Sequence, residues 1–241
     1  MPIREARLSD HYAMAVVFGK AFFNEDLFGR IIHPHRDTYP DDVTLYWLRR
    51  IREHWFDWRN CFLVVVTKDC DGKEAIVGVA EWTRQGAGSK VMKLSMLDPR
   101  NLGRPLFMAS NRISAYIWPN RAADPAKTNI LERAIPYSKH HWSGPRADNW
   151  YLDALAVHPD YQGKGYGKSL VTWGICKADE ENVHASVMSS AGNETFYLRC
   201  GFEEIVGWAT EGEDNPLAGV AGGAILFRAP RKATAGLKAR N

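Results

Sequence analysis

Apolar residues change their spacing several times along the chain, and each change predicts an element of secondary structure. Near the start, Arg4–Arg7 predicts a short strand. Ser9 or Asp10 then caps a helix whose apolar residues recur at helical spacing. A second helix opens at Asp41-Asp42, where negative charge suits the positive end of a helix dipole. The chain is therefore expected to begin with one strand and two helices.

A β-hairpin follows these helices. Cys61–Thr67 is a continuous run of apolar and β-branched residues, which predicts a buried strand. Asp71-Gly72 is a hairpin turn signal, and Ala75–Thr83 predicts the returning strand. This pair supplies the second and third strands of the expected sheet.

Residues 85–148 interrupt the pattern with prolines and glycines, which predicts a long insertion between the third and fourth strands. Leu106–Ile117 and Pro125–Ile135 predict helices inside it. After the insertion, strands and helices alternate. The expected strands are Trp150–Val157, Ala185–Met188, Glu203–Trp208 and Ala224–Arg228, and the expected helices are Gly167–Glu180 and Asn193–Arg199, which Gly201 ends.

This order of elements predicts an α/β domain built on one mixed sheet. We expect a single domain over residues 1–230, with the insertion at about 85–148, and a flexible basic tail at 231–241. The oligomeric state is open.

Composition narrows the classes of function. Apolar residues make up 45% of the chain and the net charge is only +3, so the sequence predicts neither nucleic-acid binding nor membrane attachment. No apolar leader follows the charged start. The four cysteines show no metal-ligand spacing. Free thiols in a reducing compartment, the cytoplasm, are therefore expected.

Residues 155–169 hold the chemistry. An apolar strand ends at Val157, and Gly163, Gly165 and Gly167 then lead directly into a helix. Glycines let backbone N–H groups turn toward a ligand, and a helix N-terminus adds unpaired donors and partial positive charge. With Lys164 and Lys168 nearby, this turn predicts a pyrophosphate site.

Two common phosphate motifs do not fit this turn. A P-loop needs a glycine five residues before the Gly-Lys-Ser at 167–169, but position 162 is glutamine. A dinucleotide fingerprint needs its third glycine one residue later than Gly167. A nucleoside triphosphate site is therefore disfavoured.

The pattern that fits is Gln-x-x-Gly-x-Gly at 162–167, which resembles the cofactor motif of the GCN5-related N-acetyltransferase (GNAT) superfamily. Residues 196–202, Phe-Tyr-Leu-Arg-Cys-Gly-Phe, resemble the later FYxxxGF signature of that family. The resemblance implies a GNAT-like acyl-CoA N-acyltransferase fold with acetyl-CoA as the acyl donor and no metal. The residues that it assigns to the cofactor are Leu155, Ala156, Val157, Gln162, Gly163, Lys164, Gly165, Tyr166, Gly167, Lys168 and Asn193.

Acyl transfer to an amine needs a base for the amine and an acid for the leaving thiolate. The resemblance places Tyr197 near the sulfur, and its phenol, with a pKa of about 10, is protonated at neutral pH. Asp153 is the candidate base, because a carboxyl buried within an apolar strand can have a raised pKa. The alternative is an ordinary residue on the polar face of the strand, or a partner for an arginine. Glu81 and the His140-His141 doublet are rival bases.

His158, Cys200 and several aromatic residues are weaker candidates for the active site. His158, beside Pro159, is expected to be structural, and the end of a helix raises the pKa of the Cys200 thiol, which disfavours a nucleophile there. Aromatic residues are expected either to wall a pocket for a small amine or to form core: Trp47, Trp55, Phe107, Tyr116, Trp118, Tyr137 and Trp142.

The predicted function is an N-acetyltransferase that acts on a primary amine, most simply of a small molecule, by direct attack in a ternary complex. Acetylation of a protein at its N-terminus or at lysine is an alternative, and so is a non-catalytic acyl-CoA sensor. Retention of Tyr197 favours the enzyme.

Overall fold

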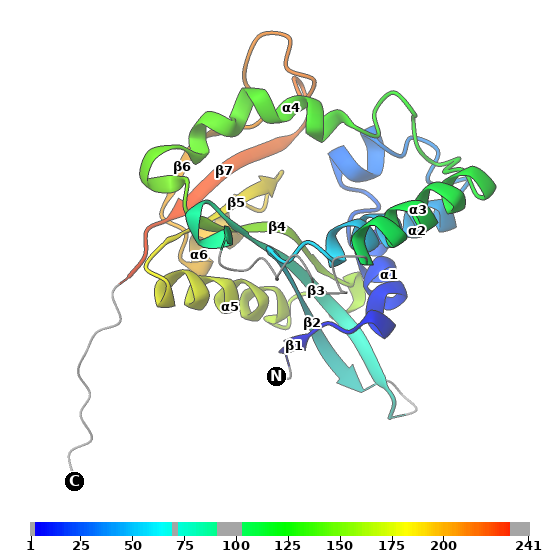
Figure 1. Cartoon of the computed structure of the whole chain (residues 1–241), viewed down its shortest axis with the longest axis horizontal. Helices are drawn as coiled ribbons and strands as arrows, with labels where there is room; N and C mark the ends of the chain where they lie inside the picture. The colour runs from blue at the N-terminus through cyan, green and yellow to red at the C-terminus, as the bar shows by residue number, and fades with distance from the viewer. Residues whose placement is uncertain (1–2, 69–71, 91–102, 232–241) are drawn as a thin grey trace.

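The structure is a computed structural model that describes residues 3–68, 72–90 and 103–231. Its centre is a seven-stranded sheet in the order β1-β2-β3-β4-β5-β7-β6 (Figure 1). The strands are β1 (Ile3–Glu5), β2 (Asn60–Lys68), β3 (Glu74–Gln85), β4 (Asn149–Val157), β5 (His184–Ser190), β6 (Glu204–Trp208) and β7 (Gly222–Arg228). The seven predicted strands are confirmed with small shifts at their ends. Asp71, the first residue of the predicted turn, lies outside the described residues.

The sheet is mixed, as predicted. Every neighbouring pair of strands is antiparallel except β4 and β5, which are parallel. A parallel pair needs a crossover, and α5 (Tyr166–Glu180) supplies it. The one parallel contact therefore lies in the middle of the sheet, beside the glycine turn.

Helices cover both faces of the sheet. Those of the described residues are α1 (His11–Ala21), α2 (Pro40–Trp55), α3 (Gly103–Ile117), α4 (Ile130–Ser138), α5 and α6 (Glu194–Cys200). The helices α1 and α2 bury Met14, Phe18 and Trp47 against one face, whereas α5 packs Leu170 and Val171 on the other. None of these helices is long and apolar enough to cross a membrane.

The insertion between β3 and β4 differs from its prediction in one place. A helix was expected over Pro125–Ile135, but α4 begins only at Ile130, and residues 125–129 form turns. The Asp124 side chain accepts the N–H of Ala126 (2.9 Å), which stabilises a turn instead of a helix. From Ile130 on, α4 packs against β7 in a third apolar cluster and crosses above that strand (Figure 1).

The close approach of α5 to β3 gives a stability prediction. A Cβ built on Gly174 would lie 2.1 Å from the ring of Trp82, which is fully buried. Alanine normally favours a helix over glycine by about 1 kcal/mol, but overpacking costs about 1–3 kcal/mol or more. Gly174→Ala should therefore lower the free energy of unfolding, measured by urea denaturation. Thr172→Ala, exposed on the same helix, is the control and should change it little. A stabilised Gly174→Ala variant would contradict this packing.

Candidate active site

The strands β4 and β5 separate at the middle of the sheet. They pair only from Asn149 to Leu152, whereas β4 stays paired with β3 up to Val157. The β3 register slips at the same point, because Glu81 faces Ala154 and Trp82 faces Leu152, which leaves Asp153 as an extra residue. Such a bulge bends the strand that carries it. The edge of β4 that faced β5 is therefore unpaired over residues 153–157.

A cleft of about 640 Å³ lies where the two strands part. Its lining includes nearly all residues that the sequence assigned to the cofactor, together with Tyr197. They are Leu155, Ala156, Val157, Gln162, Gly163, Gly165, Tyr166, Gly167, Lys168 and Asn193. Lys164 and Asp153 do not line it. The structure thus brings one strand edge, the glycine turn and one face of α6 to a common cavity.

The glycine turn has the backbone that an anion site needs. Gly163 and Gly165 have φ of 75° and 81°, a left-handed conformation that favours glycine. Gly165 is also the N-cap of α5, so the amides of the following first turn have no acceptor within the helix. Gly167 packs near Phe196 of α6, since a Cβ there would lie 3.3 Å from that ring. Partial positive charge from α5 therefore points into the cleft.

Lys164 does not itself line the cleft, but it lies over the ring of Tyr161, which does. Its Nζ lies 4.7 Å from the centre of the Tyr161 ring and donates to the carbonyl of Asp160 (3.5 Å). Lys168 does line the cleft. Gln162 closes the turn, because its side-chain amide donates to the carbonyl of Val157 (3.2 Å).

Tyr197 stands on α6 with its side chain 7% exposed, packed against Phe196 and Phe202. Asn193, the N-cap of α6, donates its N–H to the carbonyl of Ser190 (3.2 Å) at the end of β5. Burial raises the pKa of Tyr197 above its ordinary value. The phenol is therefore protonated at neutral pH.

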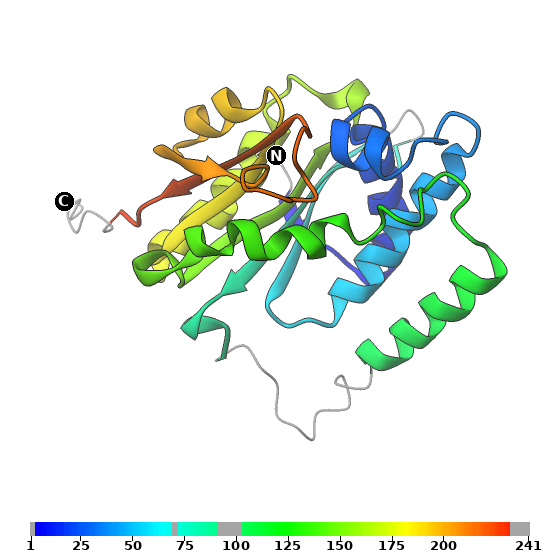
Figure 2. The same cartoon turned by 90° about the horizontal axis from the view of Figure 1, so that it is seen from above.

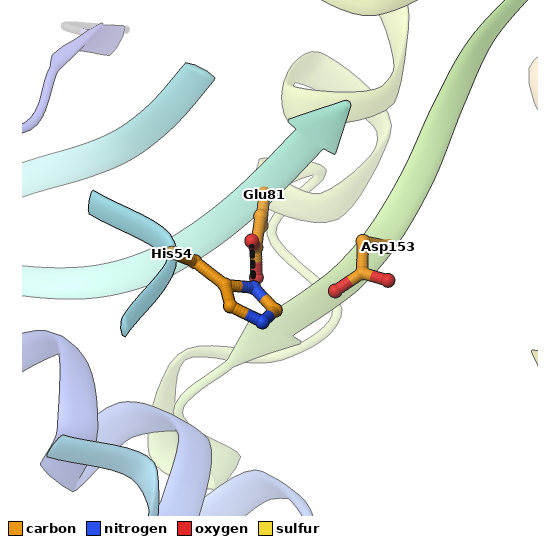
Figure 3. A group of neighbouring side chains, drawn as sticks. All are labelled: His54, Glu81 and Asp153. Carbon is orange, nitrogen blue, oxygen red and sulfur yellow. Dashed lines mark hydrogen bonds and ion pairs between the residues drawn. The ribbon is translucent and has the colours of Figure 1, made fainter. Parts of the chain in front are cut away.

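Asp153 belongs to a charged network between α2 and the sheet. Arg50 of α2 forms an ion pair with Asp153, and the Nδ1 atom of His54 lies 2.5 Å from a carboxylate oxygen of Glu81. His54, Glu81 and Asp153 point toward one another from three different elements (Figure 3). Their side chains are unequally exposed: Glu81 2%, Asp153 22% and His54 32%.

The raised pKa expected for Asp153 is found on Glu81 instead. Burial, with the nearby charge of Asp153, raises the pKa of Glu81 despite the opposing effect of His54. Burial alone would also raise the pKa of Asp153, but the charges of Arg50 and His54, with hydrogen bonds from Arg50 and Glu81, together hold that pKa below its usual range. The expectation of a raised pKa was wrong, and the alternative of an arginine partner is confirmed, with that arginine 103 residues away in the chain.

His54, Glu81 and Asp153 could in principle hold a metal ion, since their ligand atoms lie within 4.8 Å of one another. Two contacts argue against it. Arg50 already supplies the positive charge on Asp153, and His54 already bonds to Glu81. A metal would have to displace the guanidinium and break that hydrogen bond.

The other candidates lie away from the cleft. His141 packs against Gly207 of β6, and the ring nitrogen of His158 accepts the N–H of Asp160 (3.4 Å), the structural role predicted for it. The pKa of Cys200 is raised as expected, with burial as the cause. None of the seven aromatic residues proposed as a pocket wall lines the cleft. Trp47 is core, and Trp118 lines a separate hollow of about 490 Å³ beside α2.

Sequence reasoning missed four residues near the candidate site. Arg50 and His54 lie one helical turn apart on α2, a spacing that puts them on one face of the helix. No sequence pattern indicates that their partners are Asp153 and Glu81. Glu25 and Ser190 line the cleft from the segment after α1 and from the end of β5. No local pattern signals either of them.

Comparisons with known proteins agree with this geometry. Residues 133–204 match the model of the acetyltransferase (GNAT) domain family. An acetyltransferase of Stachybotrys chartarum is 24% identical over 206 residues, which cover 84% of this chain and 80% of that protein. The chain thus contains a GNAT acetyltransferase domain over residues 133–204, and it is an acyltransferase enzyme.

Solved structures share the fold. The histone acetyltransferase HPA2 and related acetyltransferase from Corynebacterium glutamicum superposes with a TM-score of 0.57 at 21% identity, over 96% of this chain and 97% of that one. An N-acetyltransferase from Staphylococcus aureus Mu50 gives a TM-score of 0.50 at 14% identity, over 94% of this chain and all (100%) of that one. These likenesses concern architecture, and they extend over nearly the whole chain.

The ion pair of Arg50 with Asp153 gives a pH-dependent prediction. Removing one partner of a buried pair leaves a charge uncompensated and costs roughly 2 kcal/mol or more at this partial exposure. Arg50→Met should therefore lower the free energy of unfolding at pH 7, and Arg50→Met/Asp153→Asn should recover part of the loss. A depressed carboxyl pKa stabilises the fold above the unfolded value of about 3.9. The deficit of Arg50→Met should consequently shrink as pH falls below that value toward the lowered pKa of Asp153, in urea titrations at pH 7 and about pH 3. An unchanged deficit would refute the assignment.

Proposed function

We propose that this protein transfers the acetyl group of acetyl-CoA to a primary amine by direct attack within a ternary complex. The observation that supports it most is the shared cleft. One cavity is lined by an unpaired strand edge, an amide-rich glycine turn and a buried tyrosine. Those three features correspond to the arm, the pyrophosphate and the sulfur of an acyl-CoA.

The donor fits the cleft in a defined direction. The edge of β4 at residues 155–157 has no partner on the β5 side, so it can pair with the amides of the pantetheine arm as an added strand would, although the Val157 carbonyl also accepts the Gln162 side chain. The glycine turn and Lys168 then face the pyrophosphate. Asn193 lies beside the arm at the start of α6, and Tyr197 one helical turn further on faces the thioester.

The reaction needs two proton transfers. The amine nitrogen attacks the thioester carbonyl, the C–S bond breaks as the N–C bond forms, and the amine loses a proton. Burial keeps the Tyr197 phenol protonated until it gives its proton to the leaving sulfur, and the phenolate left behind regains a proton from the base through water. We assign Asp153 as the base, acting through water, since it lies two residues before Leu155 of the cleft wall and its side chain is partly open to solvent. Glu81, behind it, is the rival base.

The acceptor in this proposal is a small molecule. Protein N-terminal or lysine acetylation is the competing assignment, and a panel of small amines beside short peptides separates the two. A thermal-shift titration with acetyl-CoA, followed by thiol release over that panel, tests the whole proposal. Stabilisation grows as RT ln(1 + [L]/Kd), about 2.7 kcal/mol at a hundredfold excess over Kd. Stabilisation without thiol release on any amine or peptide would favour a non-catalytic acyl-CoA sensor.

The glycine turn predicts a specific loss of donor affinity. Gly165→Ala forces an L-residue into a left-handed conformation at the N-cap that faces the pyrophosphate. The acetyl-CoA-induced thermal shift should shrink in this variant, with the Kd raised about tenfold. Gly219→Ala imposes the same strain (φ 82°) in a loop outside the cleft. It should lower stability and leave the Kd unchanged. Equal effects on the Kd would exclude a cofactor role for the turn.

Tyr197 predicts a loss of turnover without a loss of donor binding. Tyr197→Phe keeps the ring packed between Phe196 and Phe202 but removes the proton donor. General acid catalysis contributes about 10²–10⁴-fold, so kcat should fall at least about a hundredfold in the thiol-release assay. The thermal shift with acetyl-CoA should stay as in the wild type. Phe202→Leu, which alters the packing alone, is the control. A Tyr197→Phe variant with normal kcat would remove Tyr197 from the mechanism.

A further inference from the structure

Glu25 is the one carboxylate among the described residues that line the cleft. It follows α1, and the lining also takes Ala21, Phe22 and Asn24 from this segment. Across the cavity stand the strand edge at Leu155 and the α6 tyrosine. The acidic network around Asp153, in contrast, does not reach the lining. An acidic group therefore faces the space where donor and acceptor would meet.

The local fold holds the Glu25 carboxylate firmly in place. One of its oxygens accepts the N–H of Phe28 (2.6 Å), and the Ser190 hydroxyl also hydrogen-bonds to it. The residues after it form a π-helical turn, η2 (Asp26–Ile31). Gly29 is required there, since a Cβ would lie 2.3 Å from the Phe23 carbonyl. Through Ser190, Glu25 is tied to the end of β5, where Asn193 starts the helix that carries Tyr197.

Glu25 lacks the counter-charge that other sheltered acids of this protein have. Asp42, Asp153 and Asp179 each form an ion pair with an arginine. No ion pair of Glu25 exists among the described residues, although burial raises its pKa. A carboxylate that is removed from water and has no cation beside it gains most from a charged ligand.

We propose that Glu25 binds the ammonium group of the acceptor, which makes the substrate class of this enzyme alkylamines that are cationic at neutral pH. This inference rests on the proposed function and defines its acceptor side. The cleft then has a cationic end at Lys168 and the glycine turn, for the donor phosphates, and an anionic point at Glu25, for the acceptor. Glu25 is a specificity-determining residue in this scheme, and proton removal stays with Asp153.

The Glu25→Gln variant distinguishes binding of an ammonium group from the capping of the π-helical turn by Glu25. The glutamine carbonyl still accepts the N–H of Phe28, so the π-helical turn keeps its cap while the charge is lost. Asp26→Asn is the matched control: it removes the neighbouring charge, and the side chain of Asp26 accepts the N–H of Ala221 (2.9 Å) outside the cleft. Acceptors are phenethylamine, putrescine and lysine, which carry an ammonium group at pH 7, and aniline, which does not. The acetyl-CoA thermal shift verifies that each variant is folded and loaded.

We expect Glu25→Gln to lower kcat/KM roughly tenfold or more for each cationic amine that the wild type acetylates, mainly through KM. Turnover of aniline and the acetyl-CoA thermal shift should stay unchanged, and Asp26→Asn should behave as the wild type. Unchanged KM values for the cationic amines in Glu25→Gln would overturn the inference, and so would a wild type that acetylates aniline alone. A wild type that releases no thiol with any amine or peptide would instead remove the proposed function, a result obtained before any variant is compared.

Discussion

The fold depends on a sheet that opens in its middle and still remains one body. Only four residue pairs, Asn149–Leu152 with His184–Val187, join β4 to β5. Hydrogen bonds alone would hold this β4–β5 seam only weakly. The apolar cluster under α5 spans it, because that cluster unites residues of β2, β3 and β4 with residues of β5 and β7. Packing therefore secures the seam from one side, and the opposite end of the same seam is free to separate into a binding cleft.

Charge is distributed to support this opening. Arg50 and Asp153 join α2 to the bulge at which β4 leaves its partner, and Arg228 joins β7 to the end of α5 through Asp179. Both pairs connect elements far apart in the sequence and lie at the border of the core, where partial shielding strengthens them. Glu25 stands outside this scheme. An acid that pairs with an arginine stabilises the fold. An acid without such a partner can bind a cationic ligand instead.

Much of the fold could be predicted from local pattern. Periodicity alone identifies two long strands, Cys61–Thr67 and Trp150–Val157. The spacing of the glycines at 163–167 predicts an anion-binding turn. Pro125–Ile135 misled because the Asx turn at Asp124 competes with helix formation. The sequence could not identify Arg50, on which the pKa of Asp153 depends. Glu25 gave no signal, since its contact with the end of β5 is made through Ser190, far away in the chain. Local signals predict elements, and long-range contacts determine what those elements do.

The separation of β4 from β5 also bears on solubility. An unpaired strand edge is usually a hazard, because its free amides and carbonyls can recruit another polypeptide and start aggregation. Here the unpaired run lies on an interior strand, and Ala21, Phe22 and residues of α6 line the same cleft. A slender chain such as a cofactor arm can enter between those walls, but a second protein strand with its side chains meets them first. The molecule thus keeps a reactive backbone edge available to a ligand without offering it to other copies of itself.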